Sequence, residues 1–347
     1  MGSLRIAVAL PHLGVYGGIR RFLELGNVWV ERGHEVALLT ASPEGGDRPW
    51  IPFRGRIGAF DTLSTERWDL LLSPDPEIFV RCESPGALRV YYSVLEGAPA
   101  EARALERADL VLANSAGMRR YLARKGVSAA DAAGGVNVRW FCPPASDPRP
   151  WRARAEGTVH ALVYGRLSRR RKGTWTAALA VERAAKSAGV PVTLTLFDAP
   201  PEGSAAPVTP RALAIPHRWV LDPNQEELRD LYRDADLFVS AERRAGWCNT
   251  AAEAMACGAA LVCTPSGTED FAVDLETATV SRWPWAWLLA RAMKPLLVDP
   301  ARRAALAARG RARIQEFSWE RTADRIERAI ESALGGRNDA GETKPVV

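Results

Sequence analysis

Cysteine and histidine are scarce in this sequence. Their number and placement argue against a disulfide-stabilised fold and limit the possible catalytic histidines. The five cysteines are scattered and odd in number, and no two of them form a C-x-x-C pair. A disulfide framework would need an even set, so we expect reduced, mostly buried thiols in a cytoplasmic protein. The four histidines leave few positions for a catalytic imidazole.

Long apolar runs and a strong charge of one sign are also missing. No apolar run reaches the roughly 18 residues that a membrane-spanning helix needs. The apolar start, residues 4–10, is broken at Pro11 and lacks a cleavage-site pattern, which favours a first strand over a signal peptide. The formal charge of +5 is mild and does not demand nucleic acid. We expect a soluble protein with at most peripheral membrane contact and no nucleic-acid partner.

What the sequence does contain is an alternation of strand and helix patterns over 347 residues. Alternation without hairpin signals predicts parallel sheets covered on both faces, the α/β class, and the length fits two domains. Residues 141–154 hold four prolines, which cannot continue a helix or a central strand. We therefore predict a first doubly wound, Rossmann-like domain over 1–145, a second over 146–334, and a flexible tail over 335–347.

The expected elements follow in chain order. We expect strands at 4–10, 34–40, 69–73, 88–92, 109–113, 159–164, 192–197, 218–221, 236–240 and 260–264. We expect helices at 19–32, 99–107, 116–125, 174–188, 224–234, 250–256, 283–297 and 318–334. The helix over 283–297 places Trp285, Leu288, Leu289, Ala292 and Leu296 on one face, which favours a core helix over one lying on a membrane.

Residues 236–264 form the most informative stretch, a strand, a loop, a helix and a strand. The loop 241–249 then lies at the carboxyl end of a parallel strand, where open α/β sheets bind ligands. Asn249 or Thr250 can cap the helix, and Gly246 permits close approach of a phosphate to the first-turn N–H groups. Glu253 either accepts hydrogen bonds from hydroxyls such as a ribose diol or stabilises the helix dipole.

Two further loops carry candidate anion-binding groups. Five basic residues lie between Arg166 and Lys172, where they either pair with phosphate oxygens or form a solvated charge run. Gly17 and Gly18 immediately before a helix leave bare N–H groups, or else mark a plain tight turn. The order K-G-T excludes a Walker loop, and the absence of G-x-G-x-x-G excludes a dinucleotide fingerprint.

Taken together, these motifs resemble the GT-B glycosyltransferases, specifically the retaining family 4 (group 1), over about residues 1–325. In the first domain the resemblance rests on the glycine pair, RGHEVALLT, ADLVLANSAGMRRYLARKGV and GGVNVRWFCPP. In the second it rests on YGRL…KG, LDPNQEELRDLYRDADLFVSA, AGWCNTAAEAMACGAALVCTPSGTEDFA and FSWERTADRIE.

The resemblance implies two Rossmann-like domains facing a central cleft and a metal-independent transferase that retains anomeric configuration. The donor would be a UDP-, GDP- or dTDP-sugar, and the acceptor a glycan, a lipid-linked molecule or a small molecule in polysaccharide or glycoconjugate biosynthesis. No cofactor is implied. Arg166 and Lys172 match the catalytic basic pair that grips the diphosphate. The implied donor-binding residues are Gly17, Gly18, Gly246, Trp247, Asn249, Thr250 and Glu253.

Two positions depart from the family pattern. An acid eight residues before Glu253 is replaced by Ala245, and the usual first-domain histidine is replaced by Leu95. Glu242 and His12 are further candidates for these roles, and Asp270 is a third candidate near the site. The two losses keep open an alternative, a non-catalytic nucleotide-sugar or glycan-binding protein on the same fold.

Overall fold

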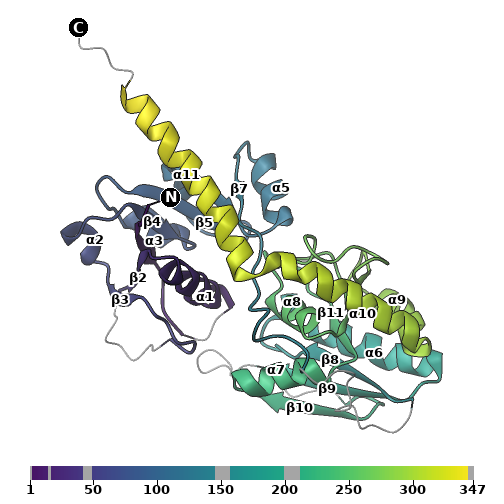
Figure 1. Ribbon diagram of the computed structural model, residues 1–347. Coiled ribbons are helices and arrows are strands. Elements are labelled where there is room, and N and C mark those ends of the chain that lie inside the picture. Colours follow the sequence, from purple (N-terminus) through teal and green to yellow (C-terminus); the bar gives the residue numbers. More distant parts are fainter. Residues whose placement is uncertain (1, 15–16, 42–48, 145–156, 199–211, 343–347) are drawn as a thin grey trace. The chain divides into compact units, whose positions relative to one another are not determined.

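The computed structural model (Figure 1) describes residues 2–14, 17–41, 49–144, 157–198 and 212–342. The chain forms two compact units, each with its own sheet and core. The first comprises residues 1–135 together with 317–347, and the second comprises residues 136–316. The sequence places the boundary at residues 145 and 146, which lie outside the described residues.

The first unit is a doubly wound α/β domain. Its described strands form a seven-stranded sheet in the order β3-β2-β1-β4-β5-β6-β7, and every neighbouring pair is parallel. The strands are β1 (Arg5–Ala9), β2 (Glu35–Thr40), β3 (Arg56–Ala59), β4 (Leu70–Ser73), β5 (Leu88–Ser93), β6 (Leu110–Ala113) and β7 (Ala130–Asp131). The helices are α1 (Gly17–Glu31), α2 (Thr62–Thr65), α3 (Pro76–Arg81), α4 (Glu101–Arg107), α5 (Ala116–Arg124) and α11 (Trp319–Glu342).

The last helix, α11, belongs to the first unit, whereas the sequence-based division assigned residues 318–334 to the second. Its apolar stripe, Trp319, Ala323, Ile326 and Ile330, is buried in the core of the first sheet. Arg32, which directly follows α1, holds the polar side of α11 through ion pairs to Asp324 and Glu327. An apolar stripe shows that a helix is buried but not against which domain. The helix also continues to Glu342, beyond its expected end at residue 334.

The second unit repeats the architecture with a six-stranded parallel sheet among the described residues, in the order β10-β9-β8-β11-β12-β13. The strands are β8 (Val159–Tyr164), β9 (Val192–Asp198), β10 (His217–Leu221), β11 (Leu237–Ser240), β12 (Ala260–Cys263) and β13 (Thr279–Val280). The helices are the 3₁₀ turn η1 (Arg170–Lys172), α6 (Thr174–Ala188), α7 (Gln225–Asp234), α8 (Asn249–Ala256), α9 (Ala286–Val298), α10 (Pro300–Ile314) and the 3₁₀ turn η2 (Gln315–Phe317), which spans the junction with the first unit. The predicted α/β class with two doubly wound parallel sheets is confirmed.

Strand order locates the point in the second unit where a ligand site is expected. β8 pairs with β9 on one side and with β11 on the other. The chain therefore leaves β8 in one direction and returns, after β10 and α7, on the opposite side. Such a switch point opens a crevice at the carboxyl ends of the two strands. The loops after β8 and β11 contain the two stretches that the sequence singled out.

The helix expected over 283–297 starts at Ala286, and its buried face differs from the expected one. Leu289 and Leu296 are buried as predicted, but their companions are Ala290, Met293 and Leu297. Trp285 precedes the helix and is 52% exposed, so its assignment to the core is wrong. No described helix is long and apolar enough to cross a membrane. All five cysteines are free, and all but Cys142 are buried, as the composition indicated.

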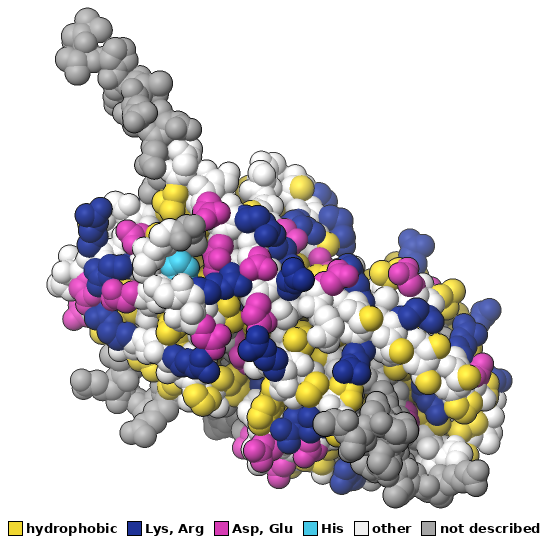
Figure 2. All heavy atoms as spheres, viewed as in Figure 1, with side chains coloured by type: hydrophobic (Ala, Val, Ile, Leu, Met, Phe, Trp, Pro, Cys, Tyr) yellow, Lys and Arg dark blue, Asp and Glu magenta, His cyan; other side chains and the backbone are white. Residues whose placement is uncertain are grey.

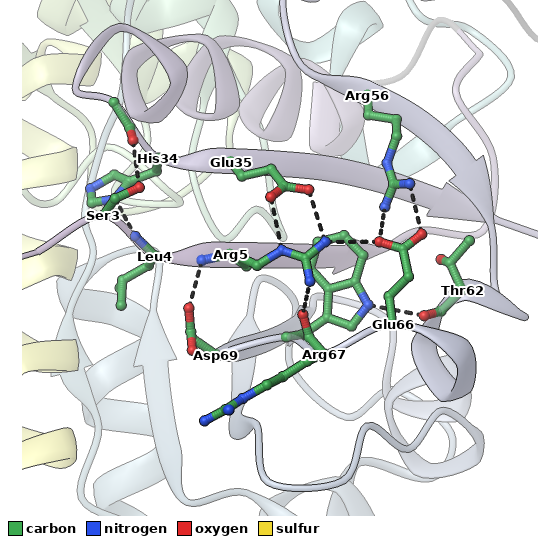
Figure 3. Close-up of polar contacts among 12 residues, drawn as sticks. Ser3, Leu4, Arg5, His34, Glu35, Arg56, Thr62, Glu66, Arg67 and Asp69 are labelled. Atoms are coloured by element: carbon green, nitrogen blue, oxygen red, sulfur yellow. Dashed lines mark hydrogen bonds and ion pairs between the residues drawn. The ribbon is translucent and has the colours of Figure 1, made fainter.

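An ion network joins the amino ends of the first three strands of the first unit (Figure 3). Arg5 opens β1 and donates to the carboxylate of Glu35, which opens β2, and to that of Glu66. Arg56, which opens β3, donates two further bonds of 2.7 Å to Glu66. The carboxylate of Glu66 thus lies between two guanidinium groups at the amino ends of these strands. Open α/β sheets bind ligands at the opposite, carboxyl ends, so we expect this network to serve stability.

We expect Glu66→Gln to lower the melting temperature at neutral pH and to have little effect in acid. The hydrogen bonds from Arg56, supported by those from Arg5, hold the pKa of Glu66 below its ordinary value. A carboxylate with a lowered pKa contributes stability above its unfolded-state pKa, and that contribution is lost as the pH falls through the folded-state pKa. Melting curves from pH 7 to pH 3 should therefore converge for wild type and variant. Glu106→Gln, an exposed α4 control, should track wild type throughout; a constant gap for Glu66→Gln would contradict the charge-based account.

Candidate functional site

The loops that follow β8 and β11 touch each other at the switch point of the second sheet. The backbone N–H of Arg243 donates to the carbonyl of Arg171 at 2.8 Å. Gly173 ends the η1 turn with φ of +66°, and a Cβ atom there would lie 2.1 Å from the carbonyl oxygen of Ala241. Glycine is therefore required both by its backbone conformation and by the contact between the loops. The close approach brings the basic segment against the segment that starts the 241–249 loop.

Glu242 lies at the centre of this contact and is 2% exposed. Its Oε1 atom accepts a hydrogen bond from Lys172 Nζ at 2.6 Å and one from Arg171 Nη1 at 3.2 Å. The hydroxyl of Thr264 donates to the backbone carbonyl of Glu242 at 2.5 Å. A buried carboxylate needs such partners, and in return it fixes the position of the two cations.

Tyr164 and Cys248 complete the surroundings of the two cations without adding charge at neutral pH. The Lys172 ammonium lies 5.7 Å from the centre of the Tyr164 ring. Burial raises the pKa of Tyr164 to about 12. Burial likewise raises the pKa of Cys248 to about 11, with the charge of Glu242 acting in the same direction. The thiol and the phenol both stay protonated, so the field at the site comes from the basic residues and the carboxylate.

Arg166 contributes a further cation from the end of β8. It follows Gly165 directly, is 7% exposed, and its Nη1 atom lies 3.8 Å from Oδ1 of Asp198 at the end of β9. A glycine is needed at 165 because a Cβ atom there would lie 2.6 Å from the ring of Trp219. The carboxyl edge of β8 therefore carries both members of the basic pair that the sequence predicted, Arg166 and Lys172.

The loop before α8 is well packed, and the start of the helix differs from the expected one. Cys248 occupies the N-cap position and makes no side-chain capping bond. Asn249 and Thr250 are the first two helical residues, so the expectation that either caps the helix is wrong. Gly246 is buried, as is Trp247, whose ring packs on Phe271 with centroids 4.9 Å apart. The predicted donor-binding role of these residues stays a prediction.

Glu253 lies on α8 and is 4% exposed. Its Oε2 atom accepts a hydrogen bond from the hydroxyl of Tyr232 on α7 at 2.9 Å. The sequence left two interpretations of Glu253, a carboxylate that binds hydroxyls and a helix-dipole partner. Its burial and its hydrogen bond from Tyr232 hold the carboxylate in a fixed position, as a binding role would need. Its ribose-binding role remains an expectation.

The other predicted residues lie elsewhere. Gly17 and Gly18 are the first two residues of α1 rather than a loop before it, and they belong to the first unit with His12. His12 Nδ1 accepts the backbone N–H of Gly14 at 3.2 Å. Asp270 lies after β12, and its backbone carbonyl accepts a hydrogen bond from Arg313 at 2.9 Å.

Sequence reasoning did not single out three partners of the site. Arg171 was visible only as part of the basic run, although it shares Glu242 with Lys172. Asp198 could have been suspected because it ends a strand next to β8. Tyr232 gave no signal, because its hydroxyl reaches Glu253 across 21 positions of sequence.

Comparison with known sequences bears on the second unit above all. Residues 158–309 match the family described as "Glycosyl transferases group 1". The D-inositol 3-phosphate glycosyltransferase of Salinispora tropica is 37% identical over 116 residues, which is 32% of this chain and 24% of the relative. The enzyme of the same name from Rhodococcus erythropolis is 28% identical over 191 residues, 53% of this chain and 43% of the relative. The chain thus spans less than half the length of each of these relatives.

Solved structures resemble the whole chain. Sucrose-phosphate synthase from Thermosynechococcus elongatus superposes with a TM-score of 0.75 at 21% identity, covering 96% of this chain and 100% of that one. HepE from Anabaena, described as a complex with UDP-glucose, gives a TM-score of 0.71 at 15% identity and covers 95% and 100%. At these identities the likeness shows the fold, which is GT-B as the sequence motifs indicated. The two relatives matched by sequence are named as glycosyltransferases, so the comparisons do not favour the non-catalytic alternative.

Proposed function

Because residues 158–309 match the family described as "Glycosyl transferases group 1", we propose that the protein transfers a sugar, with retention, from a nucleotide-diphosphate sugar. The acceptor is a glycan, a lipid-linked molecule or a small molecule. The observation that carries the proposal is the cluster of Arg166, Arg171 and Lys172 at the switch point of the second sheet. Buried free thiols fit work in the cytoplasm, where disulfides are rare.

The proposed chemistry assigns the cations to the leaving group. The bond between the sugar's anomeric carbon and the diphosphate breaks, and negative charge gathers on the departing oxygens. A new bond forms to the acceptor oxygen, and the acceptor's proton passes to the leaving diphosphate. Fixed cations stabilise the developing charge more than the ground state, which is what lowers the barrier. In this proposal Lys172 and Arg166 supply that charge, and no metal or cofactor is required.

Supporting residues hold the proposed site in shape. Glu242 acts as a positioning residue, since its carboxylate fixes the ammonium group of Lys172 at 2.6 Å. The first turn of α8, residues 249–251, offers N–H groups to a phosphate. Glu253, fixed by Tyr232, is placed one turn further along and is proposed to accept hydrogen bonds from the ribose.

The test is a thermal-shift panel of UDP, GDP, dTDP and ADP with the full chain. UDP is the first candidate because the fold neighbour HepE is described with UDP-glucose. A ligand at 100 times its dissociation constant stabilises by about 2.7 kcal/mol, so one nucleotide should raise the melting temperature by several degrees. Sugar release from the matching nucleotide sugar is then measured with candidate acceptors. No shift with any of the four nucleotides would overturn the proposed donor site.

A further inference from the structure

Three tryptophans form an exposed ladder on the second unit, at the start of α9. Trp283, Trp285 and Trp287 are 49%, 52% and 51% exposed. Their rings stack in sequence, with centroids 6.0 Å and 6.1 Å apart and planes inclined by 19° and 27°. No other tryptophan among the described residues is exposed. Exposed aromatic groups in contact mark an interaction surface rather than a chance exposure.

Other apolar groups extend this surface. Leu275 is 63% exposed and has φ of +62°, a left-handed conformation that is costly for a leucine. Strain of this kind persists only where the surrounding structure imposes it, and it is found where function uses it. Here it holds a bulky apolar side chain outward in the loop that precedes β13.

A cavity of about 430 Å³ joins Leu275 to the ladder. Trp283, Leu288 and Pro295 contribute apolar wall, and three arginines, Arg282, Arg291 and Arg302, stand around it. Asp274 also lines the cavity, but its Oδ1 atom accepts the backbone N–H of Val280. Among the described residues no carboxylate lies within ion-pair distance of Arg291 or Arg302. With three arginines against one carboxylate, the cavity combines apolar wall with an excess of positive charge.

We propose that this surface, defined by the tryptophan ladder, Leu275 and the arginine-lined cavity, docks the protein on an anionic lipid bilayer. Tryptophan is enriched at membrane interfaces because its apolar ring carries a polar N–H edge. Basic groups beside it attract anionic headgroups, and the cavity fits a lipid phosphate with the first part of its chain. Figure 2 shows dark blue and yellow side chains mingled over α10 and its neighbour α9, the helices that carry Arg302 and Arg291 of the cavity.

The arrangement of the rings separates this partner from two others. A sugar or a nucleic-acid base stacks on a free aromatic face. Here Trp285 is stacked with both Trp283 and Trp287, and the Arg282 guanidinium lies 5.5 Å from the centre of the Trp283 ring, so part of the aromatic face is already in contact within the protein. The docking surface lies beside β13, two strands away from β11, so it is separate from the basic cluster of the donor site.

The experiment is co-sedimentation of the full chain with vesicles of phosphatidylcholine alone and of phosphatidylcholine mixed with phosphatidylglycerol. Wild type should bind the mixed vesicles, less strongly as salt rises. The double variant Trp285→Ser/Trp287→Ser should lose at least about tenfold in partition, because the buried apolar area is removed. Arg291→Ala/Arg302→Ala should lose the preference for the anionic vesicles.

Leu221→Ser is the matched control, since Leu221 is 73% exposed on β10, away from this surface. It should bind like wild type, and unchanged melting temperatures show that all variants fold. The proposal is overturned if wild type does not bind mixed vesicles, or if the tryptophan variant binds them as wild type does. It is also overturned if these tryptophans instead control binding of an oligosaccharide or a single-stranded RNA. None of these readouts depends on sugar transfer.

Discussion

Lys172→Ala is expected to remove most of the activity and the response of the melting temperature to the nucleotide. The ammonium group is held at 2.6 Å from the buried carboxylate of Glu242, at the carboxyl edge of β8. A lysine elsewhere on the surface, whose ammonium group moves freely, cannot supply the same fixed charge. Removing one preorganised group that stabilises developing charge costs about 10²–10³ in rate, and we expect a loss of that size in kcat/KM.

The measurement compares wild type with two lysine variants in the nucleotide panel and in a transfer assay. Lys186→Ala is the matched control, because Lys186 is exposed on α6, the helix that follows the basic loop. It should keep both activity and nucleotide response. Lys172→Ala leaves the carboxylate of Glu242 with one basic partner, Arg171, so the melting temperature of the variant without ligand is recorded as well. An undiminished nucleotide shift in Lys172→Ala would remove this residue from the donor site.

Gly173→Ala is expected to be the most damaging single substitution for the geometry of the site. Alanine in the left-handed conformation costs about 1–2 kcal/mol. In addition, its Cβ atom would lie 2.1 Å from the carbonyl oxygen of Ala241, and relieving such a clash by backbone movement costs roughly another 1–3 kcal/mol. The loops after β8 and β11 must separate, which pulls Lys172 away from Glu242.

Gly189→Ala isolates the effect of the contact from that of the conformation. Gly189 ends the same helix, α6, with φ of +65°, and nothing lies within 4 Å of the position its Cβ would take. It should lose only the conformational part and keep nucleotide binding. The two variants should differ by roughly 4–8 °C in melting temperature for about 2 kcal/mol in a unit of this size. Equal melting temperatures would show that the loops accommodate the methyl group.

The hydrophobic pattern was sufficient for most of the fold. The strand over 159–164 and the helix over 174–188 have the expected bounds, because buried parallel strands are continuous apolar runs and helices repeat every 3.6 residues. The pattern failed at α10, for which we made no prediction. Its buried residues include Ala307 and Gly310, and such small side chains give a weak signal even though the close approach of Gly310 to Met255 depends on them.

For the site, the sequence alone determined which residue types gather after the strands: a basic run, a glycine-containing loop and a carboxylate within the next helix. Only the tertiary structure decided their partners. Glu242 meets Lys172 across 70 positions of sequence, and Tyr232 meets Glu253 across 21, because strand order and not chain order sets which loops become neighbours. The same holds for α11, whose apolar stripe the sequence shows, and for the tryptophans at 283–287, whose exposure it does not. Local pattern reports what a segment must bury, whereas its partner depends on where the rest of the chain folds.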